Sequence, residues 1–191
     1  MYDTNEMEHP KLTSRAFPWF IREATTSDAE ALMTYCNMMA QETPNNTTLR
    51  MSLLPQNVME YRDLICHYCK HKHSCLFVVV DGARIVGQIK IDGNDHPLTA
   101  HVVELSINIS PEYRGQRMGS ALLQQAVDWA RRRGAIRRVQ LSVLARNQGA
   151  IRLYERMGFR VEGLRQGAYN LSDETGSPDE DAFVMGMLLE N

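Results

Sequence analysis

The chain has 191 residues, 43% of them hydrophobic and 23% charged, and its formal net charge is −2. This is the composition of a globular domain, and it excludes a disordered or collagen-like chain. The near-neutral charge argues against a dedicated nucleic-acid-binding protein. No apolar run approaches the roughly 18 residues of a membrane span, and the N-terminus lacks the apolar stretch of a signal peptide. We therefore expect a soluble, cytoplasmic protein that has neither nucleic acid nor a membrane as its partner.

In the first half of the chain, strand and helix patterns alternate. Residues 1–16 are mostly polar and have no apolar period, so we expect a mobile tail before a single domain over 17–191. Asp81-Gly82 favours the positive φ angles of a tight turn and predicts a hairpin. The expected elements are a strand over 17–24, a helix that opens at 26–30 and breaks at 44–46, a second helix from after Pro55 toward Cys69, and hairpin strands over 76–80 and 85–91.

The second half continues the alternation. Residues 101–110 alternate between apolar and polar, which indicates a half-buried strand, and Gly134 and Gly158 are typical of helix ends. After a polar loop over 92–99, the expected elements are this strand, a long helix over 116–133, a strand over 139–143, a short helix from Asn147 to Gly158, a strand over 159–164, a loop over 165–181 and a strand over 182–189. Together they predict one α/β domain with a mixed, mostly antiparallel sheet of about seven strands flanked by helices.

Residues 109–123 combine a strand end, a turn with two glycines and two arginines, and the start of the long helix. The first N–H groups of a helix have no internal partner and lie at the positive end of its dipole, so such a turn binds anions, a pyrophosphate in particular. Gly115 and Gly119 would let the ligand approach the backbone closely. The alternative is a plain turn whose arginines face solvent.

Two motifs resemble the signatures of the GNAT superfamily of N-acetyltransferases. Tyr113-Arg114-Gly115-Gln116-Arg117-Met118-Gly119, followed by Leu122-Leu123, is similar to the family's acyl-CoA pyrophosphate loop. The run from Asn147 to Phe159, with Ala150, Leu153-Tyr154 and Gly158-Phe159, is similar to its second signature. The two stand in the family's order with a strand between them, which makes the resemblance specific. One departure is Arg117, where the family commonly has glycine.

The resemblance implies a site for acetyl-CoA between a splayed fourth and fifth strand, here 102–110 and 138–144. It implies that the backbone of Ile107, Asn108 and Ile109 pairs with the pantetheine arm. It further implies that the pyrophosphate is held by Arg114, Gly115, Gln116, Arg117, Met118, Gly119 and Ser120. Asn147 matches the residue that bonds pantetheine, although its position equally suits a helix N-cap.

The resemblance also implies catalytic roles for two residues. Tyr154 matches the family's general acid, since a phenol stays protonated at neutral pH yet can donate to a thiolate. The alternative for Tyr154 is a packed helix tyrosine. Glu104, on the polar face of its strand, is the expected base for the amine proton, directly or through water, and a solvent-facing carboxylate is the alternative. His101 and Tyr169 are weaker candidates for the base.

The expected function is transfer of an acetyl group from acetyl-CoA to a primary amine by direct attack, with a small-molecule amine as the acceptor. A protein N-terminus or lysine as acceptor, or a non-catalytic acyl-CoA-binding module, are the alternatives. Acids at 173–174 and 179–181 could attract a cationic acceptor, or could simply form a polar loop. Dimers are common among such domains, so a homodimer is compatible with the resemblance, but no residue pattern demonstrates one.

The segment 66–75 holds three cysteines and three histidines, which are suitable ligand types for zinc. Their spacing does not resemble that of structural zinc sites, which bring two ligand pairs together across a longer loop. We therefore expect no metal site and four reduced thiols.

Overall fold

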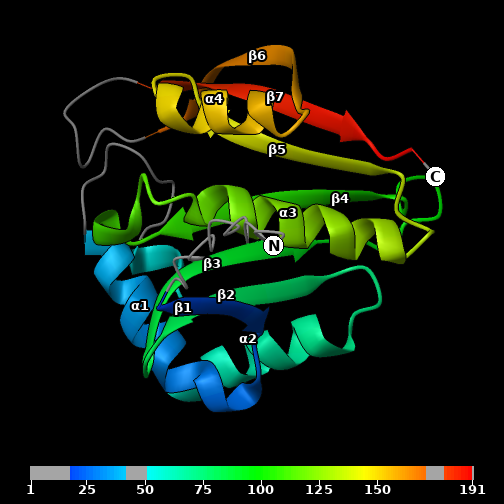
Figure 1. Ribbon diagram of the computed structural model, residues 1–191. Helices are drawn as coiled ribbons and strands as arrows, with labels where there is room; N and C mark the ends of the chain where they lie inside the picture. Colours follow the sequence, from blue (N-terminus) through cyan, green and yellow to red (C-terminus); the bar gives the residue numbers. More distant parts are fainter. Residues whose placement is uncertain (1–17, 42–50, 171–178, 191) are drawn as a thin grey trace, which may run out of the picture.

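The computed structural model describes residues 18–41, 51–170 and 179–190, and it contains one seven-stranded sheet in the order β1-β2-β3-β4-β5-β7-β6 (Figure 1). The strands are β1 Trp19–Glu23, β2 Cys75–Asp81, β3 Arg84–Asp92, β4 Val102–Ile109, β5 Arg138–Leu144, β6 Arg160–Tyr169 and β7 Glu180–Leu188. The helices are α1 Ala29–Gln41, α2 Val58–Lys70, α3 Met118–Arg132 and α4 Gln148–Arg156. The predicted tail over 1–16, the helix break at 44–46 and the centre of the predicted loop over 165–181 lie outside the described residues.

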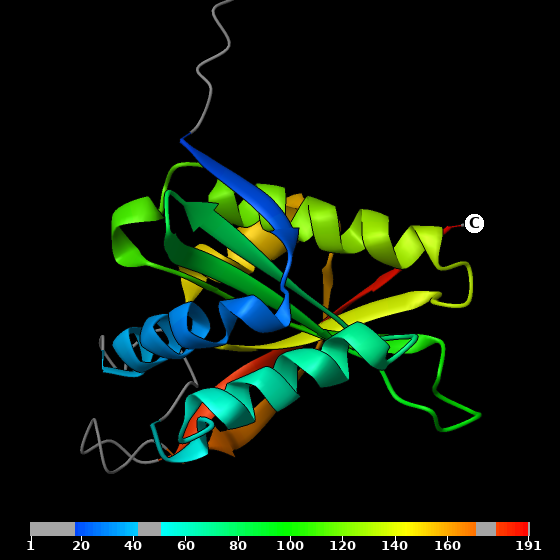
Figure 2. The same ribbon diagram turned by 90° about the horizontal axis from the view of Figure 1, so that it is seen from below.

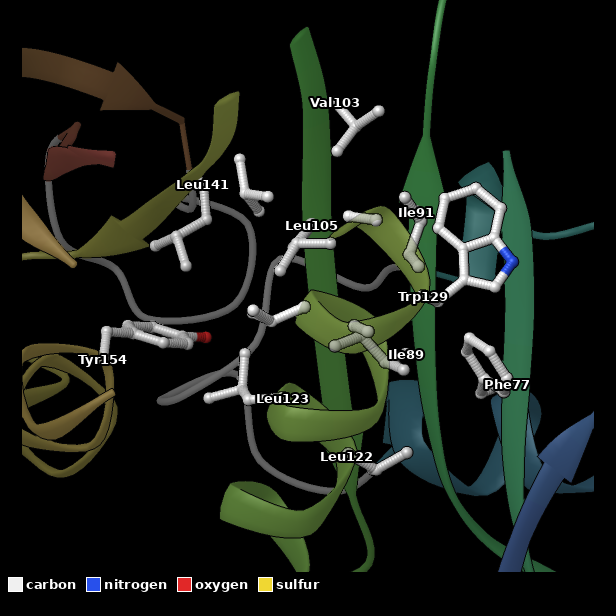
Figure 3. Packing of buried hydrophobic residues seen from close by; sticks show 14 of the residues in the cluster. Phe77, Ile89, Ile91, Val103, Leu105, Leu122, Leu123, Trp129, Leu141 and Tyr154 are labelled. Atoms are coloured by element: carbon white, nitrogen blue, oxygen red, sulfur yellow. The ribbon is translucent and has the colours of Figure 1, made fainter. Parts of the chain in front are cut away.

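The sheet separates two layers of helices. Figure 2 shows α3 and α4 on one face and α1 and α2 on the other. The larger hydrophobic core lies under α3 and α4, where Leu122, Leu123 and Trp129 pack on strand residues such as Ile89 and Leu105 (Figure 3). A smaller core joins α1 and α2 to the other face of β2. Side chains of one strand alternate between the two layers, so each strand supplies residues to both faces. The mixed α/β fold expected from the sequence is confirmed.

All neighbouring strands pair antiparallel except β4 and β5. This parallel pair is short, because only 102–104 of β4 pair with 138–140 of β5. Both strands continue well past these positions, β4 to Ile109 and β5 to Leu144, without further pairing to each other. The two strands therefore diverge, as the expected splayed pair requires, and β4 does not pair with β5 beyond Glu104.

The first helix begins slightly later than its capping residues suggest. Thr26–Asp28 form a 3₁₀ turn, and the α-helix starts at Ala29. Asp28 accepts a hydrogen bond from the Thr25 backbone N–H at 2.8 Å and forms an ion pair with Arg22 at 2.7 Å. The Arg22 guanidinium and these hydrogen bonds lower the pKa of Asp28 to about 2. The charged side chain thereby joins β1 to the start of α1.

The C-terminal hairpin differs from the prediction. The predicted sixth strand ended at residue 164, but β6 runs to Tyr169 and pairs with β7, which already begins at Glu180. Residues 160–167 are exposed, so both faces of this edge strand contact solvent and its apolar period is absent. Gly167 has φ +56° and its N–H donates to Asp181, which keeps the irregular ladder together. Glycine and polar residues in this segment therefore indicated a loop where a solvent-exposed strand exists.

The long helix also starts later than predicted, at Met118 instead of Gln116. Gly115 has φ +73° and Arg117 has φ +65°, so the chain turns through left-handed conformations immediately before the helix. In the described part of the chain, Arg117 is the only non-glycine residue with positive φ. The left-handed conformation is disfavoured for a residue with a Cβ, and this explains why glycine is the commoner residue here in sequences of similar pattern.

Replacement of Arg117 by glycine should relieve this strain. We expect R117G to raise the free energy of unfolding by about 0.5–1 kcal/mol, the left-handed penalty less the extra entropy of an unfolded glycine. Chemical denaturation measures the effect. The control is R117A, which removes the same charge but keeps a Cβ and should give no gain. Equal stabilisation by both variants would show that charge, not backbone conformation, is responsible.

Candidate active site

A cavity of about 1380 Å³ runs through the sheet where β4 and β5 diverge. It is lined on one side by residues of α1 and α2, such as Leu32 and Tyr61, and on the other by the loop before α3 and by α4. Because these helices cover opposite faces of the sheet, the cavity connects both layers. Two molecules that approach from opposite faces could therefore meet between the strands.

The loop before α3 presents a row of backbone donors to this cavity. The N–H groups of residues 115–120 donate to no acceptor among the described residues, and the first intrahelical bond of α3 is that of Ala121 to Arg117 at 3.1 Å. Arg114 differs from the expectation, since its N–H already donates to the Pro111 carbonyl at 3.0 Å. Six donors at the positive end of a helix form a suitable cradle for the pyrophosphate of acetyl-CoA.

The predicted loop residues do not all reach the cavity with their side chains. Arg114, Gly115, Arg117, Gly119 and Ser120 line it, whereas Gln116 and Met118 are not among its lining residues. The Gln116 side chain donates to the Glu112 carbonyl at 2.7 Å, and Met118 is buried in the core. The side chains of these two residues are therefore not available to a ligand in the cavity.

Gly119 lines the cavity and also has a packing role that the sequence did not indicate. A Cβ at this position would lie 2.9 Å from Leu153 Cδ2 and 3.3 Å from Ile109 Cδ1. The missing side chain therefore allows α3 to pack closely against α4 and β4. Gly115, in contrast, is needed for its positive φ, and a Cβ there would meet no atom within 4 Å.

The strand and helix residues expected at the pantetheine arm do reach the cavity. Ile107, Asn108 and Ile109 line it from β4, on the part of the strand that no longer pairs with β5. A strand edge that has separated from its neighbouring strand can accept an amide-containing chain as an additional strand. Asn147 also lines the cavity, and its side chain caps α4 by accepting from the Ala150 N–H at 3.2 Å. The capping role of Asn147 is therefore present in the structure.

Tyr154 lies on α4 and lines the cavity where β4 and β5 diverge. Its ring is 7% exposed and packs edge-to-face on Phe159, with 5.9 Å between ring centroids. Figure 3 shows its hydroxyl directed away from α4, toward α3 and β4. No described residue forms a hydrogen bond with this hydroxyl, and burial raises the pKa of Tyr154 well above its ordinary value. The phenol is therefore protonated and available to a ligand.

The structure does not bring Glu104 to the cavity wall. Glu104 is exposed and is the last residue of β4 that pairs with β5, opposite Gln140. It shares a face of β4 with Ser106, two residues further along, which does line the cavity. His101, just before β4, and Tyr169, on β6, also fail to line the cavity. Direct transfer of a proton to Glu104 thus has no support from its position, whereas transfer through Ser106 or water is compatible with it.

Several polar residues of the cavity were not singled out from the sequence, and three of them lie on the central strands: Lys90, Ser106 and Ser142. The hydroxyls of Ser106 on β4 and Ser142 on β5 are buried and have no hydrogen-bond partner among the described residues. Each comes two residues after the last paired position of its strand, so the two flank the opening of the split. The signal for all three is the same: a polar residue at an inward position of an apolar strand.

The cysteine-rich segment shows no metal arrangement in the parts of the chain that the structure describes. Cys66 and Cys69 lie on α2, while Cys75 is buried on β2, and burial raises the pKa of its thiol to about 12. All four cysteines are free thiols.

Within the described ranges, no helix has the length and hydropathy of a membrane span.

Comparison with known proteins agrees with this geometry. The model of the Acetyltransferase (GNAT) family matches residues 42–159. An L-amino acid N-acetyltransferase, AaaT of Escherichia coli strain K12, is 25% identical over 162 residues, which cover 78% of this chain and 91% of that protein. A [ribosomal protein bS18]-alanine N-acetyltransferase of the same strain is 35% identical over 82 residues, 43% of this chain, and the match spans about half (52%) of that relative.

A solved structure of a GNAT-family acetyltransferase from Streptococcus pneumoniae superposes with a TM-score of 0.83 at 28% identity, covering 90% of this chain and 99% of that one. The family model covers well over half of the chain and includes both the loop before α3 and the whole run from Asn147 to Phe159. The chain belongs to the Acetyltransferase (GNAT) family and is an acyltransferase that takes its acetyl group from acetyl-CoA.

Proposed function

We propose that the enzyme acetylates the primary amine of a small molecule. The observation that supports this best is the cavity that crosses the sheet at the β4–β5 divergence, with the anion cradle on one face and a separate half under α1 and α2 on the other. The donor enters from the α3–α4 face and the acceptor from the α1–α2 face. Acetyl-CoA supplies an activated thioester, and the chain positions the two reactants and moves the protons.

The cofactor-binding residues divide into two groups in this proposal. The N–H groups of residues 115–120, with the Arg114 and Arg117 side chains, hold the pyrophosphate. The backbone of 107–109 and the side chain of Asn147 hold the pantetheine arm. Arg114 Nε donates to the Ile109 carbonyl at 3.0 Å, so one arginine connects the two groups.

Tyr154 is the proposed general acid. The leaving thiolate needs a proton as the amine attacks, and a buried phenol with a raised pKa is protonated at every pH at which the enzyme would work. Its hydroxyl has no described partner to compete for that proton. Burial also strengthens the interaction of the hydroxyl with negative charge that develops on sulfur.

Replacement of Tyr154 by phenylalanine tests this role. We expect Y154F to lower kcat by about 100-fold or more, the usual contribution of a positioned acid, with little change in the affinity for acetyl-CoA. Steady-state kinetics measure the first quantity and calorimetry the second. Y169F is the matched control, because Tyr169 does not line the cavity. An unchanged kcat in Y154F would contradict the assignment.

The amine proton is proposed to leave along β4. No carboxylate is among the described residues that line the cavity, so the first group near the acceptor is the Ser106 hydroxyl. Glu104 is on the same face of β4 and is exposed, so it can accept the proton through Ser106 or a water molecule and release it to solvent. Ser106 acts here as a positioning residue, and Glu104 as the final acceptor.

The pH dependence of an E104Q variant tests this route. We expect kcat/KM to fall by about tenfold or more at neutral pH, where the acceptor amine must lose a proton. The loss should become smaller at alkaline pH, where the free amine is abundant in solution. E155Q is the control, since Glu155 is an exposed carboxylate on α4. A pH profile of E104Q that coincides with that of the unmodified enzyme would exclude Glu104 from the route.

A protein N-terminus is the second candidate for the acceptor, because one relative is named as a ribosomal-protein alanine N-acetyltransferase. Acetylation of a panel of amines and peptides, with products identified by mass spectrometry, decides between the two acceptor classes.

A homodimer and a cytoplasmic location also stay predictions.

A further inference from the structure

Lys90 places a cation in the half of the cavity that faces α1 and α2. It lies on β3 between Ile89 and Ile91, which belong to the core under α3, so the Lys90 side chain points to the opposite face. The residue is half-buried and lines the cavity. Its charge reaches the Cys36 thiol on α1, where it opposes the rise in pKa that burial causes.

The described residues provide no counter-charge for Lys90. Within 18–41, 51–170 and 179–190, no carboxylate forms an ion pair with its ammonium group, and no side chain or carbonyl accepts a hydrogen bond from it. A half-buried ammonium group without an acceptor is unfavourable, and a bound anion would remove that cost. Lys90 is therefore arranged to meet a negative group of a ligand.

The other charged residues of the cavity also favour a negatively charged ligand. All charged side chains that line it in the described part of the chain are cationic: Lys90, Arg114, Arg117, Arg146 and Arg156. The four arginines lie on the α3–α4 side, and Arg146 is paired with Glu180. Among the described residues, Lys90 is the one cation that lines the half of the cavity under α1 and α2, where the acceptor is proposed to bind. A polyamine or a lysine-rich peptide would bring more positive charge into this cavity and would be repelled.

We infer that the acceptor is a small amine that carries a carboxylate, and that Lys90 binds this carboxylate. The inference rests on the proposed acetyltransferase function of the same site. Lys90 pairs in register with Ser106 on the adjacent strand, and adjacent strands lie about 4.8 Å apart. An amine beside Ser106 thus lies one strand from Lys90, which suits a free amino acid. Leu32, Met39 and Leu64 line the same half and would contact an apolar side chain.

The test compares amines that differ only in the carboxylate. The twenty L-amino acids are assayed with acetyl-CoA by mass spectrometry of the products, and leucine, methionine and phenylalanine are compared with their carboxamides. We expect kcat/KM to be at least about tenfold higher for the free acids, because the amides lack a charge-assisted bond to Lys90. The lower basicity of the amide amines would favour the opposite result.

A K90M variant separates the role of Lys90 from general effects. We expect its kcat/KM for the amino acids to fall, mainly through KM, to about the level of the amides, and K90R to recover part of the loss. K72M, at an exposed lysine outside the cavity, is the control. Calorimetry with acetyl-CoA shows whether K90M retains cofactor binding.

Several outcomes would overturn the inference. Amides as good as the acids, no acetylation of any L-amino acid by an enzyme that binds acetyl-CoA, transfer to spermidine or a tripeptide instead, or unchanged kinetics of K90M would each contradict it and leave the acetyltransferase function in place. Loss of acetyl-CoA affinity in K90M would assign Lys90 to the cofactor. Failure of the unmodified protein to bind acetyl-CoA would instead contradict the proposed function itself.

Discussion

The active site depends on the early end of the pairing between β4 and β5. A parallel pair that continued over both strands would close the sheet and leave no passage between its faces. Because pairing stops after residues 104 and 140, β4 and β5 separate, and the cavity can extend from the α1–α2 layer to the α3–α4 layer. Strand β7 pairs with all of β5, from Arg138 to Leu144, and this holds β5 in its diverging direction. The opening is thus stabilised by the antiparallel hairpin on its far side.

In the proposed site, backbone atoms around this opening bind the cofactor. Left-handed conformations at Gly115 and Arg117 turn the loop so that six successive N–H groups precede or begin α3. Gly119 then lets the first turn of α3 approach Leu153 on α4 and Ile109 on β4. The left-handed backbone at Arg117 and the close packing at Gly119 therefore both hold the loop before α3 rigidly beside the part of β4 that does not pair with β5.

Sequence reasoning predicted the fold and brought most of the expected cofactor-binding residues to the cavity, because both depend on local patterns. The Asp-Gly hairpin, the alternation in β4 and the glycine-containing turn before α3 are all visible within short windows. The extension of β6 was missed, since an exposed edge strand has no apolar period to reveal it. Lys90, Ser106 and Ser142 were missed because their significance depends on which face of the sheet each strand residue occupies and on where β4 and β5 separate. Glu104 was placed on the correct face of its strand, but its distance from the cavity is a matter of register that the sequence does not contain.

The most direct test of this account is a calorimetric titration with acetyl-CoA, compared with S-acetylpantetheine, which has the thioester arm but no pyrophosphate. The account predicts one-to-one, micromolar binding of acetyl-CoA and much weaker binding of the fragment, because the cradle before α3 provides much of the affinity. Absence of acetyl-CoA binding at millimolar concentration, or equal binding of the two compounds, would contradict it.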